Sequence, residues 1–462
     1  MAAEKTIFIN LFSILAMDNF TVPDGVIEEL IRNKGQDVRL VLLTGKKLLS
    51  RLASYADGQT IIVEVIQSFP PRGFIQKLFH FFYAFLIFTG STKVLATFGA
   101  RADIPPAGGN RHMWFFKSLI AGTFGQSLFV KRRLTPWLFK IIFRARPYRQ
   151  LFERYQPDLV MAPAIAFFPD VELVSEAQRR GVKTIGMAMN WDHLNKYYIP
   201  VHADWLLVQN EQMRREAINW HAYYSEQIAL VGFPQFDMYA HPEKYLIAKD
   251  QFKKDFGLEG VDKIILFISG AAYSLDEPDV IREISKWISE GKFGSKTKLF
   301  VRPYAIARDI EREHEKYKSL EDDPNIVFNW QKRSDSLESK KNFMSMLAYS
   351  NVIISIFSTT AIESAIFDKP TITVGFDGYK KRPYYQSIVR LEDMSHFRNV
   401  LETGSVKVVR SFLDLEKSLV LYLENPAIDM MARKVLVAKM CYKNDGGASK
   451  RITDFILSKI NA

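Results

Sequence analysis

The fold is decided by the stretch NVIISIFSTTAIESAIFDKPTITVGFDG, which spans residues 351–378. It begins with an apolar run, NVIISIF (351–357), whose length and composition predict a buried strand. Three hydroxyl residues then open a predicted helix, and a second apolar strand, TITVGF (371–376), follows. A strand, a helix and another strand in this order predict neighbouring parallel strands of an α/β sheet.

The turn between that strand and that helix predicts a site for an anion. Ser358, Thr359 and Thr360 stand at the helix N-terminus, where free backbone N–H groups and the positive end of the helix dipole favour negative charge. Added hydroxyls suit such a turn to a diphosphate. Glu363 lies one turn further on, where a carboxylate can accept hydrogen bonds from ribose hydroxyls. The alternative is an ordinary Ser/Thr cap with a glutamate in the first helical turn.

Outward from this stretch, strands alternate with helices along both halves of the chain. Further predicted strands are 5–12, 37–44, 60–66, 158–164, 183–189, 203–209, 263–269, 298–304 and 325–329. The alternation predicts an α/β protein of two doubly wound, Rossmann-like parallel-sheet domains that face a cleft. We assign 1–240 to an N-terminal domain facing the acceptor and the membrane. We assign 241–462 to a C-terminal nucleotide-sugar domain, whose last helix can pack back on the first domain.

Two other strand ends in the second half carry candidate phosphate contacts, because ligands of open α/β sheets bind beyond the carboxyl ends of the strands. Gly270 opens a turn of small residues in which the backbone can approach a phosphate. Arg302 ends the next strand, and its guanidinium can pair with a diphosphate. A turn without a ligand is the alternative for Gly270, and a structural salt bridge is the alternative for Arg302.

A transfer that inverts configuration needs a base to take the proton of the acceptor hydroxyl, and three residues of the first half are candidates. Asp192 follows a predicted strand whose carboxyl end should open onto the cleft, with Trp191 beside it as a surface for stacking a sugar. Asp18 lies in the loop after the first strand, and His193 is the third candidate. Each could instead be a turn or capping residue.

Composition narrows the partners and the cellular location. The net charge is +11, and residues 111–156 hold ten Lys/Arg and one acid among large aromatic residues, a pattern that suits an anionic membrane surface. A solvated basic helix is the alternative. We expect no nucleic-acid partner, since no nucleic-acid-binding motif is found.

The longest apolar run, 81–88, is too short to span a bilayer. We expect a cytoplasmic protein at the inner face of the membrane.

Other chemistries find little support in the sequence. The single cysteine, Cys441, excludes a disulfide within the chain and a cysteine zinc site, and we expect neither a metal nor a cofactor. Phosphate-loop, nucleophile-elbow, dinucleotide-binding and zinc-protease motifs are missing from the sequence. The acidic run Asp276-Glu-Pro-Asp279 is interpreted as a surface turn.

The stretch 351–378 resembles the nucleotide-sugar site of GT-B glycosyltransferases and of UDP-N-acetylglucosamine 2-epimerases. Both have a strand, a small hydroxyl- or Gly-rich turn, a helix that carries Glu, and a Lys-Pro-strand. The resemblance implies phosphate contacts at Ser358, Thr359 and Thr360 and a ribose contact at Glu363. Where the epimerases carry Gly-Gly this chain has Thr-Thr, which argues against epimerase activity.

A second stretch resembles the bacterial surface-polysaccharide branch of this group. It runs from IGMAMNWDH (185–193) through ADWLLVQN (203–210) to VGFPQFD (231–237), so the resemblance covers about residues 155–380. Relatives that polymerise glycerophosphate carry an Arg-Pro-His motif where this chain has Arg-Pro-Tyr304, which argues against glycerophosphate transfer.

The resemblance predicts a metal-independent glycosyltransferase that moves a sugar from a nucleotide-sugar to a surface-polysaccharide or lipid-linked acceptor. Three alternatives stay open at this point. They are a sugar-nucleotide epimerase of the same fold, a polyol-phosphate transferase, and a module that binds a nucleotide without catalysis. An epimerase turns over the donor alone, a transferase needs an acceptor, and a binding module turns over neither.

Overall fold

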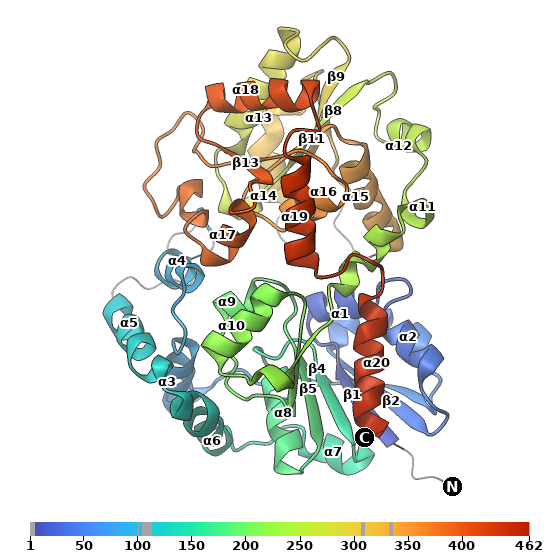
Figure 1. Ribbon diagram of the computed structural model, residues 1–462, viewed down its shortest axis with the longest axis vertical. Helices are drawn as coiled ribbons and strands as arrows, with labels where there is room; N and C mark the ends of the chain where they lie inside the picture. The colour runs from blue at the N-terminus through green and yellow to red at the C-terminus, as the bar shows by residue number, and fades with distance from the viewer. Residues whose placement is uncertain (1–4, 100, 104–112, 306–309, 332–335, 462) are drawn as a thin grey trace. The chain divides into compact units, whose positions relative to one another are not determined.

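The computed structural model describes residues 5–99, 101–103, 113–305, 310–331 and 336–461. The chain forms two compact units, each built from separate segments of the sequence. The first unit comprises Met1–Phe88, Phe115–Ala240 and Cys441–Ala462, and the second comprises Thr89–Trp114 and His241–Met440. Each unit contains one parallel sheet (Figure 1).

The sheet of the first unit has seven strands in the order β3-β2-β1-β4-β5-β6-β7. In chain order they are β1 (Lys5–Asn10), β2 (Val38–Thr44), β3 (Ile61–Val65), β4 (Leu159–Ala162), β5 (Lys183–Met187), β6 (Trp205–Val208) and β7 (Ile228–Leu230). All neighbouring pairs are parallel. The central strands are apolar and buried, as expected for a sheet covered on both faces.

Helices connect these strands. They are α1 (Ile14–Phe20), α2 (Val26–Asn33), α3 (Gly73–Ala84), α5 (Trp114–Gly122), α6 (Thr135–Ile142), α7 (Arg149–Tyr155), α8 (Asp170–Arg179), α9 (His193–Lys196), α10 (Glu211–His221) and α20 (Ala448–Asn461). α20 lies beside α2 (Figure 1). Its Ile452, Ile456 and Ile460 join the core formed by the strands of the first sheet.

The sheet of the second unit has six strands in the order β10-β9-β8-β11-β12-β13. In chain order they are β8 (Lys263–Ile268), β9 (Thr297–Arg302), β10 (Ile326–Phe328), β11 (Val352–Ser355), β12 (Thr371–Val374) and β13 (Val406–Val409). All pairs are again parallel.

The helices of the second unit include one from the first half of the sequence. They are α4 (Gly90–Phe98), α11 (Pro242–Tyr245), α12 (Lys249–Asp255), α13 (Glu277–Ser289), α14 (Ile310–Tyr317), α15 (Leu337–Tyr349), α16 (Thr360–Ile366), α17 (Ser395–Leu401), α18 (Phe412–Glu424) and α19 (Met430–Cys441). The buried faces of α13 and α18 pack on the sheet.

Both sheets have the doubly wound strand order, so the predicted α/β class with two Rossmann-like domains is confirmed. The order reverses between β1 and β4 in the first sheet and between β8 and β11 in the second. Ligands of such sheets bind beyond the carboxyl ends of the strands at this switch point. All of the predicted strands are present within two or three residues, and the sequence reasoning missed the short edge strands β7 and β13.

Residues 89–103, which we call the crossing segment, belong to the second unit and hold to it by several contacts. Ala102 N–H donates to Ala272 O at 2.7 Å, and Ser91 Oγ lies 2.7 Å from His396 Nδ1. Gly90 approaches the loop before α17 so closely that a Cβ there would lie 2.6 Å from Asp393 O. A side chain at Gly90 would therefore push α4 away from this loop.

Candidate functional site

The switch point of the second sheet is packed tightly around Gly270. A Cβ at Gly270 would lie 2.2 Å from Cδ1 of Ile356, so only glycine lets the turn after β8 meet the end of β11. The Gly270 N–H donates to Oε1 of Glu277 at 2.6 Å. The Gly270 N–H already donates to a carboxylate, so it is not available to a phosphate. A phosphate could approach this turn only because glycine has no side chain in the way. The contact stays a prediction.

The hydroxyl turn follows β11 at the same edge of the sheet. α16 begins at Thr360, and its N-cap, Thr359, makes no side-chain capping hydrogen bond. Ser358 Oγ is buried and has no hydrogen-bond partner among the residues that the structure describes. The simple capping role, the alternative to a phosphate site, is therefore not seen at Thr359. Glu363 lies half-buried on α16.

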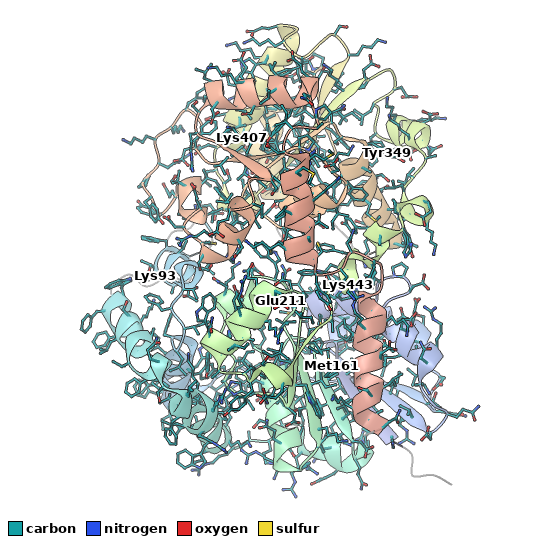
Figure 2. All side chains as sticks on the ribbon, in the orientation of Figure 1. Lys93, Met161, Glu211, Tyr349, Lys407 and Lys443 are labelled. Carbon is teal, nitrogen blue, oxygen red and sulfur yellow. The ribbon has the colours of Figure 1, made fainter. Side chains whose placement is uncertain are left out.

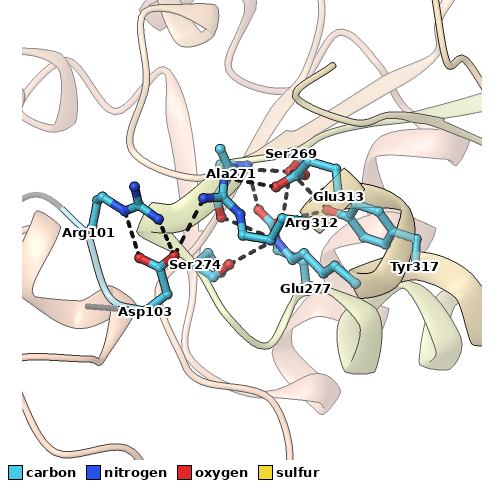
Figure 3. A network of polar contacts seen from close by, with 11 residues as sticks. Arg101, Asp103, Ser269, Ala271, Ser274, Glu277, Arg312, Glu313 and Tyr317 are labelled. Carbon is cyan, nitrogen blue, oxygen red and sulfur yellow. Dashed lines mark hydrogen bonds and ion pairs between the residues drawn. The ribbon is translucent and has the colours of Figure 1, made fainter. Parts of the chain in front are cut away.

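A buried carboxylate that the sequence interpretation missed organises this edge. Glu277, at the start of α13, accepts hydrogen bonds from Ser269 Oγ at 2.9 Å and Tyr317 OH at 2.7 Å and forms an ion pair with Lys316 (Figure 3). Its side chain is only 2% exposed, so the interpretation of the acidic run as a surface turn is wrong at this residue. No local sequence pattern marks this residue, because its burial arises from long-range packing.

A second buried carboxylate joins this network to the crossing segment. Glu313 on α14 accepts from Ser269 Oγ at 3.2 Å, and burial raises the pKa of its carboxyl group. Arg312 lies 3.5 Å from Glu313 and 3.5 Å from Asp103 (Figure 3). Asp103 also pairs with Arg101 at 2.6 Å. A chain of charges thus connects the turn after β8 to the crossing segment.

Arg302 ends β9, which is adjacent to β8 in the sheet. Its guanidinium lies over the ring of Phe343, with Cζ 4.0 Å from the ring centroid, in a cation–π contact. Ser269 N–H donates to Arg302 O at 3.1 Å. Arg302 therefore lies at the same edge as Gly270 and the hydroxyl turn, and contact with a diphosphate remains a prediction. Tyr304 follows two residues later in an irregular segment.

In the first unit, Asp192 and His193 lie in the loop between β5 and β6, at the start of α9. Asp192 pairs with Lys196, one turn along, and its Oδ1 is 3.9 Å from His193 Nε2. Burial lowers the pKa of His193, partly offset by the charge of Asp192. His193 Nδ1 has no hydrogen-bond partner within the described part of the chain. Trp191 is 2% exposed, so its ring packs in the core and is not presented for stacking.

Glu216 on α10 is a titrating neighbour of Asp192 that the sequence did not reveal. Gln212 Nε2 donates to its Oε1 at 2.8 Å and Asn195 Nδ2 at 3.2 Å. Burial raises its pKa to about 7, and the nearby charge of Asp192 adds to the rise. Glu216, a buried carboxyl group with a raised pKa, thus lies within electrostatic range of the candidate base Asp192, and perturbed pKa values are common at functional sites.

Asp18, the second candidate base, lies on α1 and pairs with Arg51 at 2.9 Å. The adjacent Asn19 donates to Met189 O at 2.8 Å, which connects α1 to the loop before Asp192. The switch point of this sheet holds a different carboxyl group, Asp170, which accepts from Asn10 Nδ2 at 2.6 Å. Burial raises the pKa of Asp170 to about 7.

The basic and aromatic stretch 111–156 is described from residue 113 onward, and Arg111 lies outside the described residues. Phe115, Phe129 and Trp137 are more than half exposed. Not all of its cations face solvent: Lys117 and Lys131 are buried, and burial lowers the pKa of Lys131 to about 8. Exposed apolar residues continue onto α3, where they are Phe74, Ile75 and Leu78.

Among the described residues, no helix is long and apolar enough to cross a membrane. No group of three or more His, Cys, Asp or Glu residues among them is placed to hold a metal ion. The expectation that catalysis is metal-independent and uses no cofactor stays a prediction.

Solved structures share the fold at low sequence identity. The S. aureus MnaA–UDP co-structure matches with a TM-score of 0.54 and 12% identity, covering 99% of this chain and 97% of that chain. UDP-GlcNAc 2-epimerase from Neisseria meningitidis bound to UDP-GlcNAc matches with a TM-score of 0.55 and 14% identity, covering 98% and 100%. A glycosyltransferase from Rickettsia africae matches with a TM-score of 0.51 and 13% identity, covering 98% and 99%.

These matches confirm the predicted GT-B-type fold and the resemblance to glycosyltransferases and 2-epimerases. No curated protein matches the sequence. The sequence of residues 178–458, more than half of the chain, matches the family described as CDP-Glycerol:Poly(glycerophosphate) glycerophosphotransferase. This match covers the second sheet, the hydroxyl turn, Asp192 and Glu216. The chain therefore belongs to the CDP-glycerol:poly(glycerophosphate) glycerophosphotransferase family, and the expectation that it is a transferase acting from a nucleotide-activated donor is confirmed.

Proposed function

We propose that the chain moves a polyol phosphate from a nucleotide-activated donor to the hydroxyl of a surface-polysaccharide or lipid-linked acceptor. The observation that carries the proposal is the family match over residues 178–458. The donor site is supported by the edge of the second sheet, where Ser358 lies beside the start of α16 with a buried hydroxyl that no described residue hydrogen-bonds. Arg302 ends a strand at the same edge and supplies positive charge.

In the proposed reaction the acceptor oxygen attacks the β-phosphorus of the donor. A new P–O bond forms, the bond to the bridging oxygen of the diphosphate breaks, and the nucleoside monophosphate leaves. The proton of the acceptor hydroxyl passes to Asp192, whose carboxylate form the ammonium of Lys196 stabilises. The N-terminal end of α16 favours the charge that develops on the leaving phosphate.

Sugar transfer is the second candidate, favoured by Tyr304. The resemblance places a histidine at this position in relatives that polymerise glycerophosphate, and the phenol of Tyr304 is a much weaker base. In this version the acceptor oxygen attacks the anomeric carbon of a nucleotide-sugar, and the nucleoside diphosphate leaves. The same base and the same phosphate contacts would serve both reactions.

Product analysis separates the candidates. The full chain is incubated with CDP-glycerol or with UDP-N-acetylglucosamine, each with and without a lipid-linked acceptor. Polyol-phosphate transfer releases CMP only when acceptor is present, and sugar transfer releases UDP only when acceptor is present. Conversion of UDP-N-acetylglucosamine without acceptor would instead establish an epimerase. Binding of a nucleotide with no turnover under any condition would overturn both transferase candidates.

We also propose that the first unit binds an anionic membrane surface at the inner face of the cell membrane. The support is the exposed aromatic residues of 113–156 and of α3 together with cations such as Arg133, whose side chain is exposed. Rings of this kind partition into the lipid interface while arginines attract anionic headgroups.

Sedimentation with vesicles tests the membrane proposal. Binding to anionic vesicles should fall as salt rises from about 0.1 to 1 M, because the screening length shortens from about 10 Å to about 3 Å. Phe129→Ser should weaken binding, whereas the control Ile14→Ser should not, although the two side chains are 66% and 62% exposed. Equal binding to neutral and anionic vesicles would contradict the proposed attraction to anionic headgroups. Binding to neither kind of vesicle would contradict the proposal that the first unit binds a membrane.

A further inference from the structure

A cavity of about 580 Å³ lies in the second unit, apart from the residues assigned to the donor. Its lining combines the crossing segment, through Lys93, Thr97 and Phe98, with Tyr384 and Asp393 from the long connection between β12 and α17. Trp114, the last residue of the second unit's first segment, completes it. Pockets for small ligands usually enclose about 300–1,000 Å³, so this one can hold one or two rings.

A chain of contacts connects the cavity to the segment that carries the hydroxyl turn. Thr89 caps α4 by accepting a hydrogen bond from Thr92 N–H, and Ser91 bonds to His396 on α17. The next residue of α17, Phe397, packs edge-to-face on Phe357 with ring centroids 5.3 Å apart. Phe357 immediately precedes Ser358. A ligand in the cavity would therefore lie in the same unit as the proposed donor site.

The lining has aromatic faces with polar groups between them. Trp114 is 47% and Tyr384 is 41% exposed, and Phe98 contacts Tyr384 edge-to-face with centroids 5.1 Å apart. Tyr384 OH donates to Asp393 Oδ2 at 2.5 Å, which orients the carboxylate. Lys93 is exposed on α4 (Figure 2). The cavity thus offers rings, a carboxylate acceptor and an ammonium donor within one small space.

We propose that this cavity binds a sugar ring of the acceptor. The C–H hydrogens on one face of a pyranose carry slight positive charge and pack on the negative faces of aromatic rings. Its hydroxyl groups can donate to Asp393 and accept from Lys93. The assignment of this sugar to the acceptor rests on the proposed transferase function, whereas the binding of a sugar does not.

Two other occupants fit the lining less well. A polyphosphate needs several cations, but the carboxylate of Asp393 faces the same space as Lys93 and would repel it. A lipid chain would leave Asp393 and Lys93 desolvated without partners in the ligand, which is costly. A neutral saccharide can hydrogen-bond to both groups and cover the rings at the same time.

Saturation-transfer NMR on the full chain without donor tests the proposal, with chitotriose and maltotriose as probes and glycerol 3-phosphate as the charged comparison. At least one trisaccharide should receive saturation at its ring C–H protons. Trp114→Ala and Tyr384→Ala should each weaken its binding about two- to tenfold, the effect expected for removing one aromatic contact. Tyr385→Ala is the matched control, since Tyr385 is also 41% exposed and does not line the cavity.

The outcomes separate this proposal from the proposed function. Ser358→Ala should weaken donor binding and leave trisaccharide binding unchanged. If neither trisaccharide binds, or if Tyr384→Ala and Tyr385→Ala behave alike, the cavity is not a saccharide site. Binding of glycerol 3-phosphate that depends on Lys93, without saccharide binding, would equally overturn the assignment. Unchanged circular dichroism of the variants guards against loss of folding.

Discussion

Replacing Glu277 by glutamine should destabilise the second unit strongly. The change preserves the shape of the side chain but removes the charge that pairs with Lys316. It also replaces one carboxylate oxygen by an NH2 group, which cannot accept a hydrogen bond. The carboxylate now accepts from Gly270 N–H, Ser269 Oγ and Tyr317 OH. Breaking a buried ion pair by removing one partner costs about 3–5 kcal/mol. For a unit of this size, about 2–4 °C of melting temperature are lost per kcal/mol.

We therefore expect Glu277→Gln to lower one calorimetric transition of the full chain by at least about 6 °C. Lys286→Gln is the matched control on the same helix: its side chain is 60% exposed, and its ammonium lies 3.9 Å from Glu283. Exposed pairs contribute about 0–1 kcal/mol, so the control should shift the transition by no more than about 4 °C. Equal shifts in the two variants would refute the idea that a buried, ionised Glu277 holds this edge together.

Further predictions concern the site itself. Asp192→Asn should lower turnover about 10²–10⁴-fold with donor affinity nearly unchanged; a similar loss in Asp18→Asn alone would make Asp18 the base. Ser358→Ala combined with Thr359→Ala should weaken donor binding by about 1–3 kcal/mol in calorimetry, and an unchanged affinity would exclude the hydroxyl turn from the donor site. Because burial raises the pKa of Glu216 from 4.5 to about 7, the folded chain binds a proton that the unfolded chain has released. The stability from this proton is complete below about pH 4.5 and is lost as the pH rises through about 7. Glu216→Gln should therefore reduce the fall in melting temperature between pH 5 and pH 8, and parallel curves for variant and wild type would contradict this.

Much of the fold could be predicted because the signals are local. Apolar runs such as 351–357 become buried strands, and alternation with helices implies parallel pairing. The short strand β13 (Val406–Val409) was missed because an exposed lysine interrupts its apolar pattern. The place of α4 in the second unit could not be predicted, since it depends on contacts such as Ser91 with His396, 305 positions apart.

Residues of the candidate site could be predicted from the sequence only where a hydroxyl or carboxyl side chain follows the end of a predicted strand. Ser358 and Asp192 stand at such positions, and the structure places both there. Glu277 and Glu216 were missed because their sequence positions, in the first and second turns of helices, are normal for solvated acids. What distinguishes them is burial, which arises from long-range packing and leaves no local pattern. The interpretation of Trp191 as a stacking surface was wrong for the same reason. An aromatic residue after a strand can point either into the core or out of it, and the local sequence does not distinguish the two.

The discontinuity of both units has a consequence for the order in which the protein can fold during synthesis. Strand β1 (Lys5–Asn10) precedes every segment of the second unit in the chain, yet the helix that completes its core, α20 (Ala448–Asn461), follows all of them. The second unit can close as soon as Met440 has emerged, because its segments all precede that point. Domains usually mature from the N-terminus onward. Here the unit that begins first is completed after the second unit, so the apolar surface that α20 covers must remain unaggregated until α20 has been made.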